Sequence, residues 1–144
     1  MISLSGSEVA AGMKEMFGDS ITGFDDDSIS VASDKWLEVA SYLREKMDFN
    51  YLCDLTAVDY KDHLDVLYRL FSLERVQSLV VRVGCKEVER PEVCSVTGLW
   101  RGADFMEREV YDLMGVNFVG HPSLRRIFLW DGFPGHPLRK DFGL

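Results

Sequence analysis

The stretch Phe49-Asn50-Tyr51-Leu52-Cys53-Asp54-Leu55-Thr56-Ala57 decides the fold, because its apolar side chains recur at every second position. Alternation with a period of two is typical of a β-strand that buries one face. We therefore predict a strand here, with residues 49, 51, 53, 55 and 57 on one face.

Two further strands follow this one. The polar turn Lys61-Asp62-His63 precedes an apolar segment from Leu64 to Leu73, in which only Asp65 and Arg69 are charged. A segment that is apolar on both faces lies in the middle of a sheet, and short polar turns join antiparallel strands. A third strand is predicted by the alternating residues Leu79, Val81 and Val83.

Helices and short strands are predicted on either side of these three strands. Residues 5–8 have the form of a capping box, and a helix follows that ends at Gly18. Strands over 21–24 and 29–31 flank an acidic run, which we interpret as a solvated turn rather than a metal site. Ser33 or Asp34 can cap a second helix with an apolar stripe at 36, 40, 43 and 47, and a third helix is predicted from 103 to 114. This order predicts an α+β fold of two layers, with a mixed, mostly antiparallel sheet and helices on one side.

The last quarter of the chain differs in composition from the rest. Three of the four prolines and four of the twelve glycines follow Val119, and the element Gly120-His121-Pro122 recurs as Gly135-His136-Pro137, each time followed by basic residues. Each proline fixes its own φ and biases the preceding histidine toward extended geometry. We predict one α+β domain over residues 1–118 and an extended Gly/Pro/Arg-rich tail over 119–144, whose aromatic residues need cover from the domain or from another protein.

Composition excludes several classes of protein. The net charge is −8 and the sequence pI is about 4.8, whereas a nucleic-acid-binding domain shows a basic face. No apolar run approaches the roughly 20 residues that cross a bilayer. The three cysteines, Cys53, Cys85 and Cys94, lack the close grouping that iron–sulfur clusters need, so we interpret them as ordinary thiols.

The residues that could carry chemistry have other interpretations that are better supported. Glu107 and Glu109 flank Arg108 on the third helix, but neighbouring helical positions point about 100° apart, which favours a surface ion-pair network or an interface over an acid/base pair. Arg108 and Asp112 have the i,i+4 spacing of an ion pair. His121 and His136 could bind a metal together with Glu109, although no further ligand motif accompanies them. Nucleotide-binding and serine-hydrolase motifs are missing from the sequence. We therefore predict no catalytic, cofactor-binding or metal-binding residues.

The remaining interpretation of these charged and aromatic residues is a protein interface. Arginine forms bidentate contacts with carboxylates, and exposed aromatic side chains are frequent anchors of protein interfaces. We predict that the third helix and the tail contact a partner protein through Glu107, Arg108, Glu109, Asp112, His121, Arg125, Arg126, Trp130, Phe133, His136, Arg139 and Lys140. The alternative is that the tail covers the edge of its own sheet.

A family resemblance covers the same region. The stretch from Glu107 to Ile127, with its Glu-Arg-Glu and Gly-His-Pro elements, resembles the signature of the 30-kilodalton, C-type subunit of NADH-quinone oxidoreductase (respiratory complex I). The segment Gly135-His136-Pro137-Leu138-Arg139-Lys140-Asp141-Phe142 is similar to its continuation, and Leu55 to Tyr60 is similar to an upstream strand of the family.

The resemblance implies a function. It implies a peripheral subunit on the cytoplasmic face of the cell membrane, which binds no flavin, cluster or quinone. It would pack on the large, D-type quinone-site subunit, near the ferredoxin-like I-type subunit, in a complex that couples electron transfer from NADH to quinone with proton translocation. Related subunits of membrane-bound hydrogenases and of dehydrogenases that use coenzyme F420 or ferredoxin are an alternative. A small metal-dependent enzyme and an assembly chaperone are two more.

Overall fold

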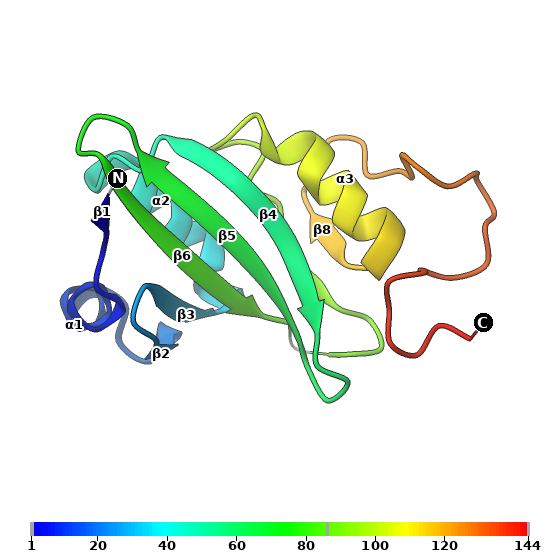
Figure 1. Ribbon diagram of the computed structural model, residues 1–144, viewed down its shortest axis with the longest axis horizontal. Helices are drawn as coiled ribbons and strands as arrows, with labels where there is room; N and C mark the ends of the chain where they lie inside the picture. Colours follow the sequence, from blue (N-terminus) through cyan, green and yellow to red (C-terminus); the bar gives the residue numbers. More distant parts are fainter. Residues whose placement is uncertain (1, 86, 144) are drawn as a thin grey trace.

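The computed structural model describes residues 2–85 and 87–143. Within them, a central sheet of six strands is formed by β1 (Ile2–Ser3), β2 (Ile21–Phe24), β3 (Ser28–Ala32), β4 (Tyr51–Asp59), β5 (Leu64–Ser72) and β6 (Gln77–Gly84) (Figure 1). The strand order is β2-β3-β6-β5-β4, and β1 pairs in parallel with β6. The β2–β3, β4–β5 and β5–β6 pairs are antiparallel, whereas β3 and β6 are parallel.

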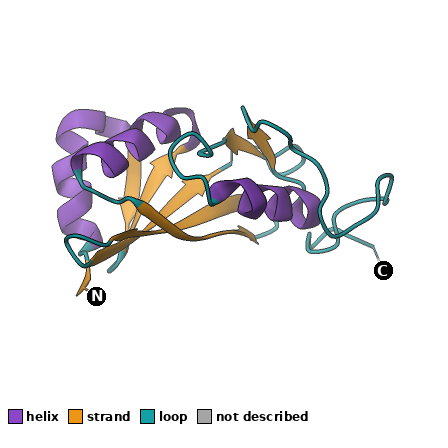
Figure 2. Ribbon diagram, turned by 90° about the horizontal axis from the view of Figure 1, so that it is seen from above, coloured by secondary structure: helices purple, strands orange, loops and turns teal. Residues whose placement is uncertain are grey.

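Helices α1 (Gly6–Phe17), α2 (Trp36–Lys46) and α3 (Ala103–Met114) lie on one side of this sheet (Figure 2). A second, two-stranded parallel sheet is made by β7 (Glu92–Cys94) and β8 (Asn117–Val119), which flank α3 in the sequence. These elements confirm the predicted α+β fold class. The predicted bounds of the third helix are also confirmed, because Gly115 takes a φ of +76° there and ends α3 in the left-handed conformation.

The core lies between the helices and one face of the sheet. Every second residue of β5 from Leu64 to Ser72 is buried, and the ring of Tyr68 packs 4.5 Å from the ring of Trp36 on α2. The indole N–H of Trp100 donates to the carbonyl of Phe49, which ties the segment before α3 to the start of β4. The open face of β5 carries Asp65 and Arg69, the two charged residues of this strand.

The structure corrects the predicted face of β4. The register against β5 shifts between Leu52 and Asp54, so that β4 carries one extra residue at this point. A bulge of this kind reverses which side chains point inward. Leu52 and Leu55 are therefore both buried, at 4% exposure each, whereas Tyr51 is 48% exposed.

The two predicted caps are also wrong. The hydroxyl of Ser5 lies 3.0 Å from that of Ser7 and caps no backbone N–H of α1. Ahead of α2, the residues Ser33–Lys35 form a 3₁₀ turn, so the helix begins after Lys35 rather than at Ser33 or Asp34.

Candidate interaction site

Residues 120–143, called the C-terminal segment below, contain no helix or strand among the residues that the structure describes. Figure 1 shows the segment passing beside α3, looping away from the sheet and returning toward the end of α3. Four groups of polar contacts hold it in this path: three lie along α3, and the fourth joins the segment mainly to the end of β4.

The first contact is made by the first Gly-His-Pro element at the start of α3. The Nε2 atom of His121 lies 3.0 Å from the Oδ1 atom of Asp104, and its Nδ1 atom accepts the N–H of Ser123 at 2.9 Å. Because Nδ1 accepts, Nε2 carries the proton and donates to Asp104. The side chain of His121 has no exposed surface.

The second contact is the buried carboxylate of Asp112 near the end of α3. Its Oδ2 atom accepts the backbone N–H groups of Ile127, Phe128 and Leu129 at 3.2, 2.8 and 3.1 Å, and its Oδ1 atom accepts Nη1 of Arg126 at 2.8 Å. Burial alone would raise the pKa of Asp112, but these donors lower it below its ordinary value. One carboxylate therefore organises four consecutive residues of the C-terminal segment.

Arg126 extends this arrangement into the loop that follows. Its Nη2 atom donates to the carbonyl oxygens of Phe133 and Gly135, each at 3.0 Å, and its guanidinium lies 5.7 Å from the centre of the Phe133 ring. The predicted pair between Arg108 and Asp112 is wrong. Arg108 instead donates to the carbonyls of Arg125 and Arg126 at 3.2 Å, because Asp112 turns inward.

The third contact is the second Gly-His-Pro element at the end of α3. The Nδ1 atom of His136 lies 2.9 Å from the carbonyl oxygen of Asp112, and the N–H of Leu138 donates to the carbonyl of Leu113 at 2.9 Å. His121 and His136 thus contact α3 eight residues apart, which corresponds to about 12 Å of helix. This geometry does not bring the two histidines together with Glu109 as a ligand set, and the described residues hold no other group of three metal-binding side chains.

The fourth contact joins the C-terminal segment to the sheet. Nε of Arg139 lies 3.0 Å from Oδ2 of Asp59 at the end of β4, Nη2 donates to the carbonyl of Val88 at 2.7 Å, and the N–H of Lys140 also donates to Asp59. The side chains of Arg139 and Asp59 are buried, at 8% and 4% exposure. Burial would raise the pKa of Asp59, but the N–H groups of Lys140 and Lys61 together with Arg139 lower it.

Glu107 corrects another prediction, because it does not lie on the surface of α3. It has no exposed surface, and its carboxylate accepts the Ser95 hydroxyl at 2.6 Å and the Val96 N–H at 2.8 Å. Burial raises its pKa, although the two hydrogen bonds oppose that shift. Glu107 therefore fixes the loop after β7 and has no surface for a partner.

Large apolar side chains of α3 and of the C-terminal segment are exposed, and of these Trp130 belongs to the predicted set. Phe128, Trp130 and Leu138 in the C-terminal segment are 63%, 67% and 60% exposed, and Phe105 on α3 is 63% exposed. Phe133 is half-buried, with its ring 4.8 Å from Trp130 and 6.2 Å from Phe142. The exposed charged residues of the predicted set are Glu109, Arg125 and Lys140.

Sequence reasoning missed Asp59 as a partner of the C-terminal segment. The one local signal was a carboxylate at the end of a mostly apolar strand, in the segment 55–60 that carries part of the family resemblance. Such a residue also fits an ordinary strand end, so the signal does not identify its partner.

Comparisons with known proteins agree with one another. Residues 29–144 match the family described as respiratory-chain NADH dehydrogenase, 30 Kd subunit. The C-type subunit of NADH-quinone oxidoreductase from Moorella thermoacetica is 46% identical over 85% of this chain and 83% of its own length. The C2-type subunit from Rhizobium etli is 41% identical over 93% of this chain and 75% of its own. A combined C/D subunit from Phocaeicola vulgatus is 40% identical over 79% of this chain and 22% of its own.

Solved structures extend the likeness. A trypsin-resistant fragment (1–134) of Nqo5 superposes with a TM-score of 0.67 at 32% identity, covering 82% of this chain and 98% of the fragment. A chain of a membrane-bound sulfane sulfur reductase, an archaeal respiratory membrane complex, shares the fold with a TM-score of 0.73 at 22% identity, over 96% of this chain and 85% of that one. In the described part of this chain, no helix has the length and apolar character needed to cross a bilayer. The chain belongs to the family of the 30 Kd subunit of respiratory-chain NADH dehydrogenase, whose members include the C-type subunits of NADH-quinone oxidoreductase.

Proposed function

We propose that this chain is a non-catalytic peripheral subunit of an NADH-quinone oxidoreductase, which docks on the large, D-type quinone-site subunit through its C-terminal segment and α3. The observation that carries the proposal is the combination of fixed backbone and exposed side chains in that segment. Asp112, Arg126 and Arg139 are used internally, and the backbone that they hold presents Phe128 and Trp130 mostly exposed.

This arrangement suits a docking surface. Large aromatic side chains that are mostly exposed on a fixed backbone bind with little loss of conformational freedom. The relative from Phocaeicola vulgatus supports the choice of partner, because its name joins C and D in one polypeptide. Two covalently joined domains have a high effective concentration for each other, which fits a direct contact.

The division into a domain over 1–118 and a tail over 119–144 is part of the proposal. The sheets and the three helices lie in residues 2–119, whereas no helix or strand is described in residues 120–143, which supports this division.

The other parts of the proposal follow from the family. The complex would transfer electrons from NADH to quinone and translocate protons, and this chain would lie at the cytoplasmic face of the membrane near the ferredoxin-like I-type subunit. If a complex that is purified through this chain oxidises NADH, then NADH is its electron donor. Oxidation of hydrogen or of reduced F420 instead would assign the chain to the related hydrogenases or F420-dependent dehydrogenases.

The docking test uses co-purification of the quinone-site subunit with this chain in mild detergent. Trp130→Ala and Phe128→Ala should each weaken association by about 1–3 kcal/mol, in the range of interface anchors. Leu73→Ala is the matched control, because Leu73 is 57% exposed on the hairpin between β5 and β6. Wild-type recovery of the quinone-site subunit by the Trp130→Ala, Phe128→Ala double variant would contradict the proposal.

A further inference from the structure

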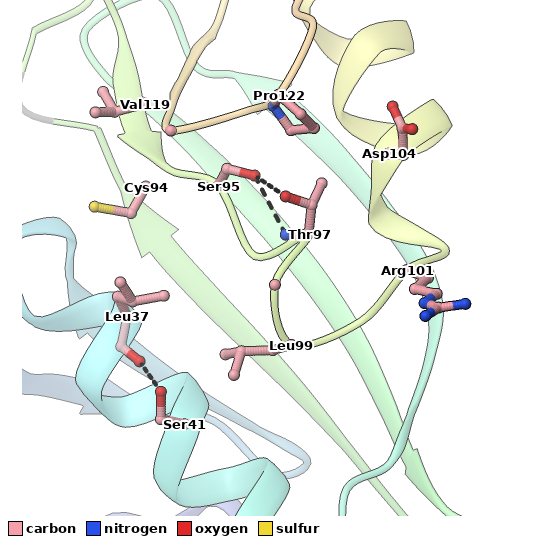
Figure 3. Close-up of a pocket in the computed structure, with 12 residues that line it drawn as sticks. Leu37, Ser41, Cys94, Ser95, Thr97, Leu99, Arg101, Asp104, Val119 and Pro122 are labelled. Carbon is pink, nitrogen blue, oxygen red and sulfur yellow. Dashed lines mark hydrogen bonds between the residues drawn. The ribbon is translucent and has the colours of Figure 1, made fainter.

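One hollow of the described surface lies away from the exposed aromatic residues of the C-terminal segment. It has a volume of about 940 Å³ and lies between α2, the loop after β7 and the first Gly-His-Pro element. Figure 3 shows Leu37 and Ser41 on α2 facing Leu99, with Cys94 and Val119 on one side and Arg101 and Asp104 on the other. We call this hollow the α2 groove.

The floor of the α2 groove is apolar and rigid. Leu37 and Val119 are 44% and 48% exposed, which is unusual for large aliphatic side chains that line a concavity. The loop 95–97 is fixed from below by Glu107, which binds the Ser95 hydroxyl and the Val96 N–H. A preformed, partly apolar concavity costs little conformational entropy to fill.

Charged side chains of both signs lie around the groove. A second hollow of about 170 Å³ shares Cys94 and Val119 with the groove and is lined also by Asp34 and Glu92. Arg101 and Asp104 line the opposite side of the groove, where the carboxylate of Asp104 lies 3.0 Å from Nε2 of His121. Among the described residues, Asp34, Glu92 and Arg101 have no ion-pair partner. A groove with an unpaired cation on one side and unpaired carboxylates on the other matches a peptide of the opposite polarity.

We propose that the α2 groove receives an amphipathic peptide segment of a neighbouring subunit, with apolar side chains on Leu37, Leu99 and Val119. An acidic residue of that segment pairs with Arg101, and a basic residue lies near Asp34 and Glu92. The proposal rests on the proposed function in one respect, because it assumes that the chain works inside a complex. It adds a second contact surface, separate from Phe128 and Trp130.

A photo-crosslinking amino acid at Gly98 tests this in the purified complex. Gly98 lines the groove, and an added Cβ there meets no atom within 4 Å, so the first atom of a new side chain causes no steric conflict. The expected result is an adduct with a peptide of another subunit in which an acidic residue lies close to apolar ones. Arg101→Glu should reduce the adduct yield at least about five-fold, whereas Arg101→Lys should retain most of it.

Parallel probes at Trp130 and Leu73 separate this inference from the proposed function. An inter-subunit adduct from Trp130 with none from Gly98 would overturn the groove as a contact and leave the docking proposal standing. Adducts of the Gly98 probe with lipid or with a second copy of this chain would also overturn it. So would an adduct yield that stays the same when Arg101→Glu is introduced. If neither Trp130 nor Gly98 crosslinks to another subunit, the proposed function fails as well.

Discussion

Replacing Asp112 by Asn should release the C-terminal segment while leaving the α+β domain folded. The carboxylate of Asp112 accepts three backbone N–H groups and one guanidinium N–H in a site with no exposed surface. Asn keeps one acceptor oxygen, so it loses either the Arg126 bond or the three backbone N–H bonds, and its NH₂ group then faces a donor.

The magnitude follows from the kind of bond that is lost. A hydrogen bond to a charged group contributes about 1.5–3 kcal/mol, and breaking a buried ion pair on one side costs about 3–5 kcal/mol when nothing relaxes. Here Arg126 and residues 127–129 belong to a segment without helix or strand, so they can move into water. We therefore expect the free energy of opening of the segment to fall by about 2–3 kcal/mol, which increases the open population roughly 30- to 150-fold.

Limited trypsinolysis of the isolated chain measures this opening. In the folded segment the guanidinium of Arg126 is bound to Asp112 and to two carbonyl groups, so it cannot enter the specificity pocket of the protease. When opening is fast relative to cleavage, the cleavage rate after Arg126 follows the open population. Mass spectrometry of the fragments identifies the cleavage site.

Asp131→Asn is the matched control, because Asp131 is an exposed carboxylate in the same segment. It should be cleaved after Arg126 at the rate of the wild type. Equal rates for Asp112→Asn and Asp131→Asn would refute the assignment of Asp112 as the residue that holds the segment.

Other changes have distinct expected outcomes. Arg139→Met leaves the buried carboxylate of Asp59 without its cation, and chemical denaturation should show a loss of roughly 2–4 kcal/mol, less for Arg139→Lys. Burial raises the folded-state pKa of Glu107 above its ordinary 4.5, so its contribution to stability is complete below 4.5 and is lost as pH rises through the raised pKa. Glu107→Gln lacks this loss, so its free energy of unfolding relative to wild type should increase as pH rises above about 4.5 in urea titrations, and a constant difference would contradict the assignment. Val76 holds a φ of +54° while half exposed, so Val76→Asn should raise the free energy of unfolding by roughly 1 kcal/mol, as measured by chemical denaturation.

The regular elements were predictable because their signals are local. Periods of two and 3.6 in the apolar pattern, together with Gly18 and Gly115, located the strands and helices, and α3 has the predicted bounds. The bulge at Cys53 was not predictable, because its cause is the pairing with β5 rather than anything in β4 itself. A pattern of apolar residues cannot report a register shift that only the neighbouring strand reveals.

For the candidate site, the sequence indicated which residues to consider but not the direction of their side chains. The family resemblance indicated the charged residues of α3 and of the C-terminal segment, and the predicted interface included Glu107, Asp112 and Arg126. The structure places all three side chains in internal hydrogen bonds, with partners 7 to 17 residues away in the chain. A helix position alone does not say whether a carboxylate points to solvent or to a loop that returns from further along the sequence.

The internal use of these charges changes what the signature residues would contribute to docking. A segment without helix or strand would lose about 1–2 kcal/mol of backbone entropy per residue on being ordered by a partner. The internal contacts of Asp112, Arg126 and Arg139 already order much of the segment in the isolated chain. The affinity of Phe128 and Trp130 for a partner would therefore depend on the fraction of molecules in which the segment is closed. A change at Asp112 should therefore weaken docking without touching the partner, and it should do so by the same factor by which it lowers the closed fraction. In this division of roles the buried charges set the geometry of the segment, and the exposed apolar side chains would provide the contact in the proposed docking.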